Sequence, residues 1–222
     1  MASTSLADFF EEHPSIKHYS ADSSEYESLK SAFVTPSPNP SVIARPQTAE
    51  EVASLVGYCA SNDTPFVVRS GGHDLQGRSA KPDMLQIDMR EIHYVHVASD
   101  RKSALIGGGI LHAKLLEELA VHQLVAATGT VGTVGYVGWA TLGGYGPLAP
   151  SLGLGADQIL GAKVVNAEGK VVEADEKLLE CLRGGGGCLG VVTELTIKIY
   201  PTQEVSIPCT QGCTQRVMMR KS

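Results

Sequence analysis

Apolar and polar positions follow a regular pattern between residues 41 and 201, and the first part of that span predicts one helix and three strands. Thr48 stands three residues before Glu51, which is typical of a helix N-terminus, and apolar residues then recur at helical spacing from Val52 to Cys59. Runs rich in β-branched and aromatic residues predict short strands in TPFVVRS (64–70), MLQIDM (84–89) and HYVHVAS (93–99). These elements predict a small α/β lobe that ends near residue 99.

The pattern from residue 100 onward predicts a second, larger lobe. SALIGGGI (103–110) is typical of a strand that runs into glycine, and leucines at helical spacing predict a helix from Leu111 to His122. QILGAKVVNAEGKVVEAD (158–175) indicates a hairpin with its turn at residues 167–170, where Gly169 supplies a positive φ. A short helix is expected over 177–182, and VVTELTIKIYP (191–201) alternates like a half-buried strand.

The two ends of the chain lack this regularity. Residues 1–40 mix polar residues with proline and serine, so we expect an irregular arm that wraps around the folded part. Residues 202–222 are expected to form an aberrant tail. Cys209 and Cys213 lie in that tail with no further cysteine or histidine nearby to complete four zinc ligands, so no metal site is expected. We expect the other three cysteines to be buried free thiols: Cys59, Cys181 and Cys188.

Composition and charge narrow the classes of function. The chain has 222 residues, 43% hydrophobic and 19% charged, with a net charge of −6, which is ordinary for a globular protein. An acidic average surface gives no electrostatic basis for binding nucleic acid or anionic lipid. The N-terminus is acidic where a signal peptide would be basic, and no apolar run approaches the roughly 20 residues that span a bilayer. A cytoplasmic location is therefore expected.

Three glycine-rich runs, at 107–109, 129–146 and 184–187, point to a large ligand. Glycine lets the backbone approach a ligand closely and aim consecutive N–H groups at anionic oxygens, as a pyrophosphate requires. No run has the spacing of a P-loop or of the dinucleotide fingerprint that opens a helix, which disfavours a nicotinamide dehydrogenase. The alternative is that these glycines only permit tight turns and bulges. Three runs in one chain favour the ligand.

His73 stands out among the histidines because it follows a predicted strand through two glycines, where ligands often meet the backbone. Arg69 nearby could bind an anion through two guanidinium nitrogens, or it could pair with a surface carboxylate. The other six histidines have no comparable context, and we interpret them as ordinary residues: His13, His18, His93, His96, His112 and His122.

RSGGHDLQGRS (69–79) resembles the flavin-attachment loop of FAD-linked oxidases of the vanillyl-alcohol oxidase type, more closely of the berberine-bridge-enzyme-like branch. Residues 129–174 and 178–201 resemble the second and third signatures of that branch, in the same order and at the same spacing. The resemblance covers about residues 41–201. It implies an α+β fold, a two-lobed PCMH-type FAD-binding module whose larger lobe has a mainly antiparallel sheet and flanking helices. The dinucleotide would lie extended between lobes 41–99 and 100–201.

The resemblance also implies which residues contact FAD. The loop from Arg69 to His73 would wrap the pyrophosphate with backbone N–H groups, and His73 matches the position that bonds covalently to the flavin 8α-methyl carbon. Some relatives carry a second linking cysteine where this chain has Val131, so attachment through His73 alone is expected. Asp157 and Val192 would line the adenine and ribose end. The remaining expected contacts are Ser70, Gly71, Gly72, Gly77, Ser79, Thr130, Val131, Gly132, Val134, Gly135, Gly138, Gly143, Gly144 and Gly146.

Enzymes of this family continue beyond the strand that ends near Pro201 into a substrate domain, which covers the flavin and supplies catalytic bases. This sequence does not show that domain, so we expect a truncated product with no assignable catalytic residue. The resemblance implies an FAD-linked oxidoreductase of secondary metabolism that oxidises a small alcohol, amine or natural-product precursor, with reoxidation by oxygen. The alternative is a non-catalytic flavin-binding or scaffold protein. An uncovered flavin face predicts self-association or a separate partner.

Overall fold

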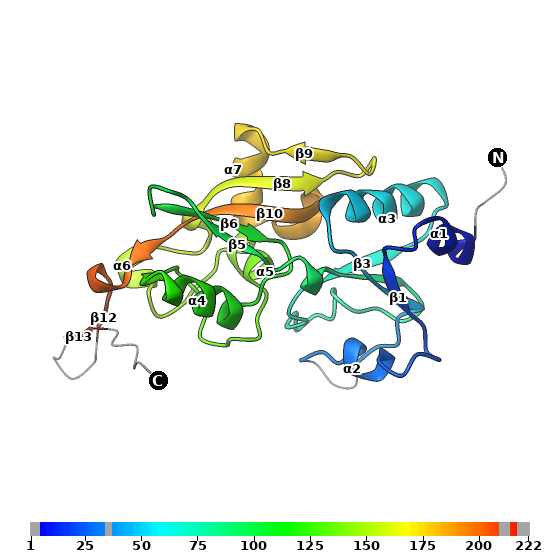
Figure 1. The fold of residues 1–222 in the computed structure, drawn as a ribbon, viewed down its shortest axis with the longest axis horizontal. Helices are drawn as coiled ribbons and strands as arrows, with labels where there is room; N and C mark the ends of the chain where they lie inside the picture. The colour runs from blue at the N-terminus through cyan, green and yellow to red at the C-terminus, as the bar shows by residue number, and fades with distance from the viewer. Residues whose placement is uncertain (1–4, 34–36, 209–213, 217–222) are drawn as a thin grey trace.

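The structure, a computed structural model, describes residues 5–33, 37–208 and 214–216, and it contains two main β-sheets (Figure 1). The first sheet has the order β1-β2-β4-β3, with bounds β1 (Lys17–Tyr19), β2 (Val42–Arg45), β4 (Leu85–Asp88) and β3 (Phe66–Arg69). β2, β4 and β3 are parallel, and β1 is antiparallel to β2. The predicted helix α3 (Ala49–Ser61) connects β2 to β3, and the Thr48 hydroxyl caps it by accepting the Glu51 N–H at 3.2 Å.

The second sheet has the order β5-β6-β10-β8-β9 and is antiparallel throughout. Its strands are β5 (Val95–Val97), β6 (Ser103–Gly107), β10 (Val191–Lys198), β8 (Ile159–Val165) and β9 (Val171–Glu173). Three helices pack against it, namely α4 (His112–Val121), α5 (Tyr136–Thr141) and α7 (Glu176–Gly185). The predicted α+β fold, with a mainly antiparallel sheet and flanking helices in the larger lobe, is confirmed.

Shorter elements complete the second half of the chain. β7 (Leu124–Val125) pairs with β11 (Tyr200–Pro201), and β12 (Ser206–Pro208) pairs with β13 (Thr214–Arg216). α6 (Ala149–Leu152) lies near the β7–β11 pair in a small third cluster of apolar side chains. Within the described ranges, no helix has the length and apolar character that a membrane span requires.

The cores of the two lobes meet at α3. Side chains from α4, α5 and α7 pack on the second sheet, whereas α1 and α3 pack on the first. Val165, at the end of β8, and Val191, at the start of β10, belong to the first core, so α3 also touches the second sheet (Figure 1). Gly169 has a φ of +69°, as the predicted turn requires, and a Cβ on it would lie 2.7 Å from Gly57 Cα of α3.

The N-terminal arm is not irregular, which corrects the expectation from the sequence. α1 (Leu6–Glu12) begins with a capping box between Ser5 and Asp8, and β1 adds an antiparallel strand to the first sheet. α2 (Tyr26–Lys30) follows β1 along the chain. The side chains of Phe9, Phe10 and Ile16 are buried in the first core. These elements are too short for their sequences to show periodicity. They are stable because they pack on the rest of the fold.

Three further expectations differ from the structure. The strand within HYVHVAS was expected in the first lobe, but it is β5 of the second sheet. The tail expected to be aberrant contains a 3₁₀ turn at Thr202–Glu204 and the β12–β13 pair, while Cys209 and Cys213 lie outside the described residues. Cys59 is a buried free thiol, as expected, but Cys181 and Cys188 are exposed. Local patterns do not specify which sheet a strand joins or which face of a short helix is covered.

Backbone packing at Gly107–Gly109 joins β6 to the segment between the two sheets. A Cβ at Gly109 would lie 1.7 Å from the Met89 carbonyl oxygen, and one at Gly108 would lie 2.3 Å from that of Val192. The N–H groups of both glycines donate to neighbouring carbonyls at 2.8 Å. This run therefore serves close packing of the chain against itself, which was the alternative to ligand binding.

A second close contact joins the loop after β3 to the segment before α5. A Cβ at Gly71 would lie 2.4 Å from the Thr133 carbonyl oxygen and 2.5 Å from the Gly135 nitrogen. A Cβ at Gly135 would in turn lie 2.3 Å from Ser70 Oγ. Because only glycine at both positions allows this approach, the contact fixes the first lobe against the second.

The second core encloses a histidine whose ring has no hydrogen-bond partner among the described residues. His112, at the start of α4, is 1% exposed, and its ring lies edge-on to Tyr136 and Trp139 at centroid distances of 5.7 and 4.9 Å. Burial lowers the pKa of His112 to about 4; nearby His73 adds to this effect and the Val131 backbone opposes it. The ring is therefore neutral at pH 7, and His112 is not the ordinary histidine that the sequence suggested.

Gly71→Ala is expected to lower the free energy of unfolding by about 1–3 kcal/mol, because its methyl group overlaps backbone atoms of the other lobe. Gly138→Ala is the matched control: Gly138 lies within α5, and a Cβ there meets no atom within 4 Å. The control is expected to be neutral or stabilising by up to about 1 kcal/mol, as for glycine replaced by alanine in a helix. Urea unfolding of both variants measures the difference, and equal losses would contradict the packing argument.

His112 is expected to make stability depend on pH. Its pKa is about 4 when folded and near 6.5 when unfolded, so between these values the unfolded chain binds a proton that the folded protein excludes. The contribution of His112 to the free energy of unfolding is therefore fully present above pH 6.5. About 2–3 kcal/mol of it is lost as the pH falls towards 4. Urea unfolding at pH 7 and at pH 4 gives the free energy of unfolding of the wild type and of His112→Leu. The decrease in this free energy from pH 7 to pH 4 should be smaller in His112→Leu by about this amount. The same loss in both proteins would refute the assignment.

Candidate cofactor site

His73 lies in the loop that follows β3 and contacts two distant segments. Its Nε2 is 2.8 Å from Thr133 Oγ1, in the segment before α5. Its ring stacks on the ring of Phe33 with 4.8 Å between centroids and 23° between planes. Burial lowers the pKa of His73, and the positive charge of Arg69 lowers it further. His73 is therefore a neutral, half-buried imidazole that stacks on Phe33 and makes its hydrogen bond to Thr133 through Nε2.

The Arg69 side chain points into the protein. Its guanidinium donates to the carbonyl oxygens of Leu29 and Ser31, in the N-terminal arm. Burial lowers the pKa of Arg69 to about 10, so the group stays protonated at neutral pH. Gly72 crosses over it with a φ of +71°, and a Cβ there would lie 3.1 Å from Arg69 Nε. The side chain therefore binds two backbone carbonyls, which corrects both the anion and the carboxylate expected for it.

An ion pair shapes the rest of this loop. Arg78 donates to the Asp74 carboxylate through Nε at 3.0 Å and through Nη2 at 2.8 Å, and these bonds lower the pKa of Asp74. Gly77 has a φ of +66° in the turn between them, and Ser79 is half-buried. Ser70, at the start of the loop, donates to the Gly109 carbonyl at 3.3 Å. Gly77 and Ser79 thus form the turn that closes the loop.

The segment that carries Thr133 is fastened to the start of α4. The Ala113 N–H donates to the Gly132 carbonyl at 2.9 Å, and the His112 N–H donates to the Val134 carbonyl at 3.0 Å. The side chains of Thr130 and Val131 are exposed, and Val134 is half-buried. The neighbours of Thr133 were expected to contact FAD, but Thr133 itself was not. No local signal shows that its hydroxyl meets a histidine 60 positions away.

The glycines after Gly135 divide into two kinds. A Cβ at Gly138 or Gly143 would meet no atom of the described chain within 4 Å, so open space lies beside these two positions. A Cβ at Gly144 would lie 2.8 Å from Gly155 Cα, and one at Gly146 would lie 1.9 Å from the Thr128 carbonyl oxygen. Gly138 and Gly143 therefore leave room that a ligand could occupy, whereas Gly144 and Gly146 serve close packing.

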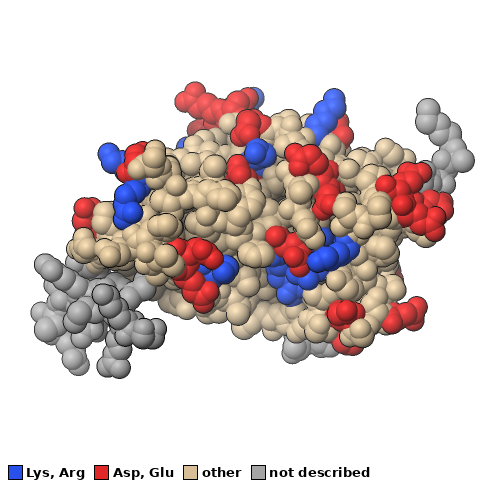
Figure 2. Space-filling view, in the orientation of Figure 1, with Lys and Arg blue, Asp and Glu red and all other residues tan. Residues whose placement is uncertain are grey.

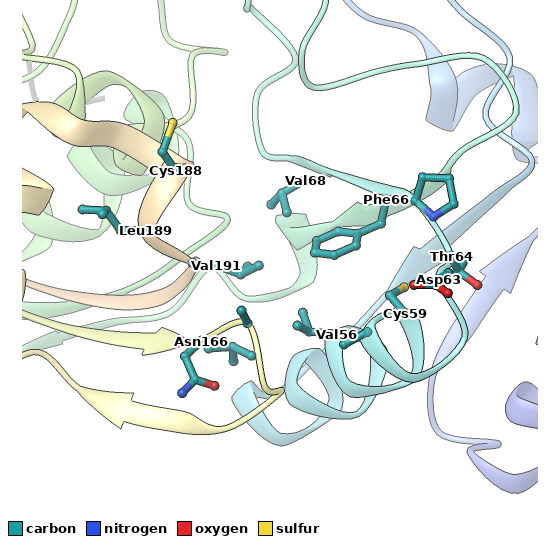
Figure 3. Close-up of a pocket in the computed structure, with 16 residues that line it drawn as sticks. Val56, Cys59, Asp63, Thr64, Phe66, Val68, Asn166, Cys188, Leu189 and Val191 are labelled. Carbon is teal, nitrogen blue, oxygen red and sulfur yellow. The ribbon is translucent and has the colours of Figure 1, made fainter. Parts of the chain in front are cut away.

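A cleft of about 580 Å³ opens between α3, β3 and the two loops at residues 165–167 and 187–191 (Figure 3). Its lining is mostly apolar and includes Val56, Phe66, Val68, Leu189 and Val191. The third glycine run reaches this cleft through Gly187, and Gly190 also lines it. Val68 immediately precedes Arg69, so the cleft lies at the base of the loop that carries His73. It brings β3, the strand that leads into the first signature segment, together with residues 187–191 of the third.

Asp157 and Val192 do not lie at the same end of the second sheet, which corrects the expectation that they line one region. β8 and β10 are antiparallel, with Ile159 beside Ile197 and Val164 beside Val192. Asp157 stands just before β8 and accepts the Leu154 N–H at 2.8 Å, which closes a local turn. Val192 adjoins the cleft through its neighbour Val191. Of the two, Val192 is the one that is adjacent to a residue lining the cleft.

Acidic and basic side chains lie in mixed groups on the face drawn in Figure 2. The ion pairs include Arg45 with Glu91 at 2.8 Å and Lys114 with Glu118 at 2.6 Å. A nucleic-acid surface requires an extended area of positive charge. The charge on this face is mixed in sign, so this face does not offer such an area.

Residues 40–175 match the family described as FAD binding domain. The FAD-linked oxidoreductase aurO of Gibberella zeae is 38% identical over 197 residues, which cover 86% of this chain and 38% of aurO. The (R)-6-hydroxynicotine oxidase of Paenarthrobacter nicotinovorans is 38% identical over 165 residues, which cover 72% of this chain and 36% of that enzyme. The chain spans well under half the length of these relatives.

Solved structures agree with these matches. The structure of 6-hydroxy-D-nicotine oxidase from Arthrobacter nicotinovorans superposes with a TM-score of 0.80 at 34% identity, covering 84% of this chain and 42% of that one. The BBE-like 1 protein of Physcomitrella patens superposes with a TM-score of 0.84 at 26% identity, covering 90% and 45%. The shared fold and the match over residues 40–175 show that this chain belongs to the FAD-binding-domain family of FAD-linked oxidoreductases.

Proposed function

We propose that this chain binds FAD between its two lobes and attaches the flavin covalently through His73. The observation that carries the proposal is a neutral histidine, held at Nε2 by Thr133, on a loop packed against the other lobe. An imidazole acts as a nucleophile only when it is neutral. With Nε2 engaged by Thr133, Nδ1 would be the nitrogen available for a bond to the flavin 8α carbon. This C–N bond would replace an 8α C–H bond, with loss of the proton to solvent, and the two electrons released would pass to the flavin ring and then to oxygen. Val131 stands where some relatives carry a second linking cysteine, so the attachment is single.

The surrounding residues fit a flavin dinucleotide. Open space beside Gly138 and Gly143 suits a flat ring near His73, and the apolar cleft beside Val68 suits an adenosine group. The loop Ser70–His73 runs from that cleft to Thr133, where its N–H groups would bind the pyrophosphate. When bound, FAD would supply a hydride acceptor that oxygen reoxidises. The chain's own part is to hold the dinucleotide and orient His73.

The activity that this site supports is oxidation of a small organic substrate. Relatives include oxidoreductases and an oxidase named for 6-hydroxynicotine, which supports an alcohol, an amine or a natural-product precursor as the substrate class. The nearby carboxylate of Asp74 is bound by Arg78, so it is not a free base. We assign no catalytic base within the described residues.

A second candidate is a flavin-binding protein without turnover. The observation in its favour is a set of exposed apolar side chains on the segments that form the site: Leu75, Val131, Leu142, Tyr145 and Leu189. Such a surface also supports self-association or a partner that covers the flavin. Release of hydrogen peroxide by the purified flavoprotein, with an alcohol or amine present, separates an oxidase from a protein that only holds flavin.

His73→Ala is expected to abolish covalent flavin while reversible binding persists. The purified protein is precipitated with acid and run on a denaturing gel, where flavin fluorescence marks covalent attachment. His93→Ala, at an exposed histidine outside the site, is the control and should keep the wild-type signal. Acid-stable fluorescence in the His73 variant would show that another residue makes the bond.

Thr133→Val is expected to slow attachment by up to about tenfold, because it removes a hydrogen bond worth about 0.5–1.5 kcal/mol that fixes the His73 ring. The change keeps the volume and β-branching of the side chain. The flavin-free variant is mixed with FAD, and acid-stable fluorescence is followed with time. A rate equal to that of the wild type would show that Thr133 does not orient His73.

A further inference from the structure

We infer that Phe33, in the N-terminal arm, is a positioning residue that holds the His73 ring ready for flavin attachment. Its ring covers one face of the imidazole, while Thr133 holds Nε2 in the plane of the ring. A face contact and an in-plane contact together fix both side-chain torsions of His73. The inference rests on the proposed covalent attachment and extends it to a part of the chain that the signature segments do not include.

The backbone holds Phe33 in register with His73. The Phe33 N–H donates to the Gly72 carbonyl at 3.1 Å, one residue before the histidine. Two residues earlier, Ser31 O accepts from the Arg69 guanidinium, which also binds Leu29 O. Arg90 Nη2 donates to the same Leu29 carbonyl at 3.2 Å. Buried Arg69, at the end of β3, and half-buried Arg90, just after β4, therefore tie the arm to the ends of these two strands, and this brings Phe33 to the imidazole.

The exposure of Phe33 supports a role in positioning rather than in core packing. The side chain is 63% exposed, so it contributes little to either hydrophobic core. The aromatic ring that it contacts within the described chain is that of His73. The stack also removes water from one face of the imidazole, in keeping with the lowered pKa of His73. A large apolar ring exposed to water is energetically unfavourable, and the stack on His73 covers one face of the Phe33 ring.

The chemistry explains why such a contact matters. The nucleophilic nitrogen must point at the flavin 8α carbon, and the rate of a reaction between held groups depends strongly on their orientation. Without Phe33, the imidazole can rotate about the single contact with Thr133. Reversible FAD binding depends on the loop backbone and the cleft, so it should change little.

The test compares Phe33→Leu, which keeps apolar bulk, with Phe33→Tyr, which keeps the aromatic ring. Flavin-free protein from a riboflavin-limited host is mixed with FAD, and both the first-order rate of acid-stable fluorescence and the Kd for FAD are measured. Phe33→Leu should attach flavin about tenfold more slowly, with Kd within about twofold of the wild type, and Phe33→Tyr should restore the rate. Val121→Ala, at an exposed apolar residue at the end of α4, should behave as the wild type.

A second readout does not require flavin. An NMR titration of labelled histidine in the flavin-free proteins should show the pKa of His73 rising in Phe33→Leu and unchanged in Phe33→Tyr. Wild-type attachment kinetics in Phe33→Leu, failure of Phe33→Tyr to restore the rate, or an unchanged His73 titration in Phe33→Leu would each overturn the inference. If the wild type forms no acid-stable flavin, the proposed attachment fails, while the titration still decides whether Phe33 holds His73.

Discussion

The contact between Gly71 and Gly135 determines the geometry of the whole site. It brings the end of a parallel strand in the first lobe against the segment that precedes α5 in the second, with too little room for any side chain. His73 lies two residues beyond this contact, and Thr133 lies two residues before it on the other side. This alignment of the two segments places the Thr133 hydroxyl within hydrogen-bond distance of His73. A shift of either lobe would therefore move His73 away from the hydroxyl that holds its ring.

Glycine has two opposite uses in this protein, and both come from the missing Cβ. At Gly109 and Gly146 the chain packs against its own carbonyl oxygens, so these glycines allow close packing and leave no room for a ligand. At Gly138 and Gly143 the same absence leaves open space next to the site. A glycine-rich segment therefore serves close packing at some positions and leaves open space at others.

Burial keeps the two histidines of this region neutral. His73 is half-buried beneath Phe33, and His112 is enclosed between Tyr136 and Trp139 behind the segment that carries Thr133. Desolvation lowers the pKa of each, and the proximity of one to the other adds to the effect on His112. Arg69 stays charged because it is buried against carbonyl oxygens, which stabilise a cation. Its charge in turn disfavours protonation of His73.

The sequence by itself determined the regular elements, the family and the loop that carries His73. Periodicity located α3, α4 and β10, and the order of the three signature segments indicated a two-lobed FAD-binding module, because these signals are local. Tertiary structure alone decided the partners of His73. Phe33 and Thr133 lie far from His73 in sequence, and no local pattern pairs either of them with it. Arg69 points inward and binds the N-terminal arm, which has no visible pattern. Tertiary structure also decided that Asp157 and Val192 lie at opposite ends of the second sheet. Antiparallel pairing, not composition, sets which ends of two strands meet.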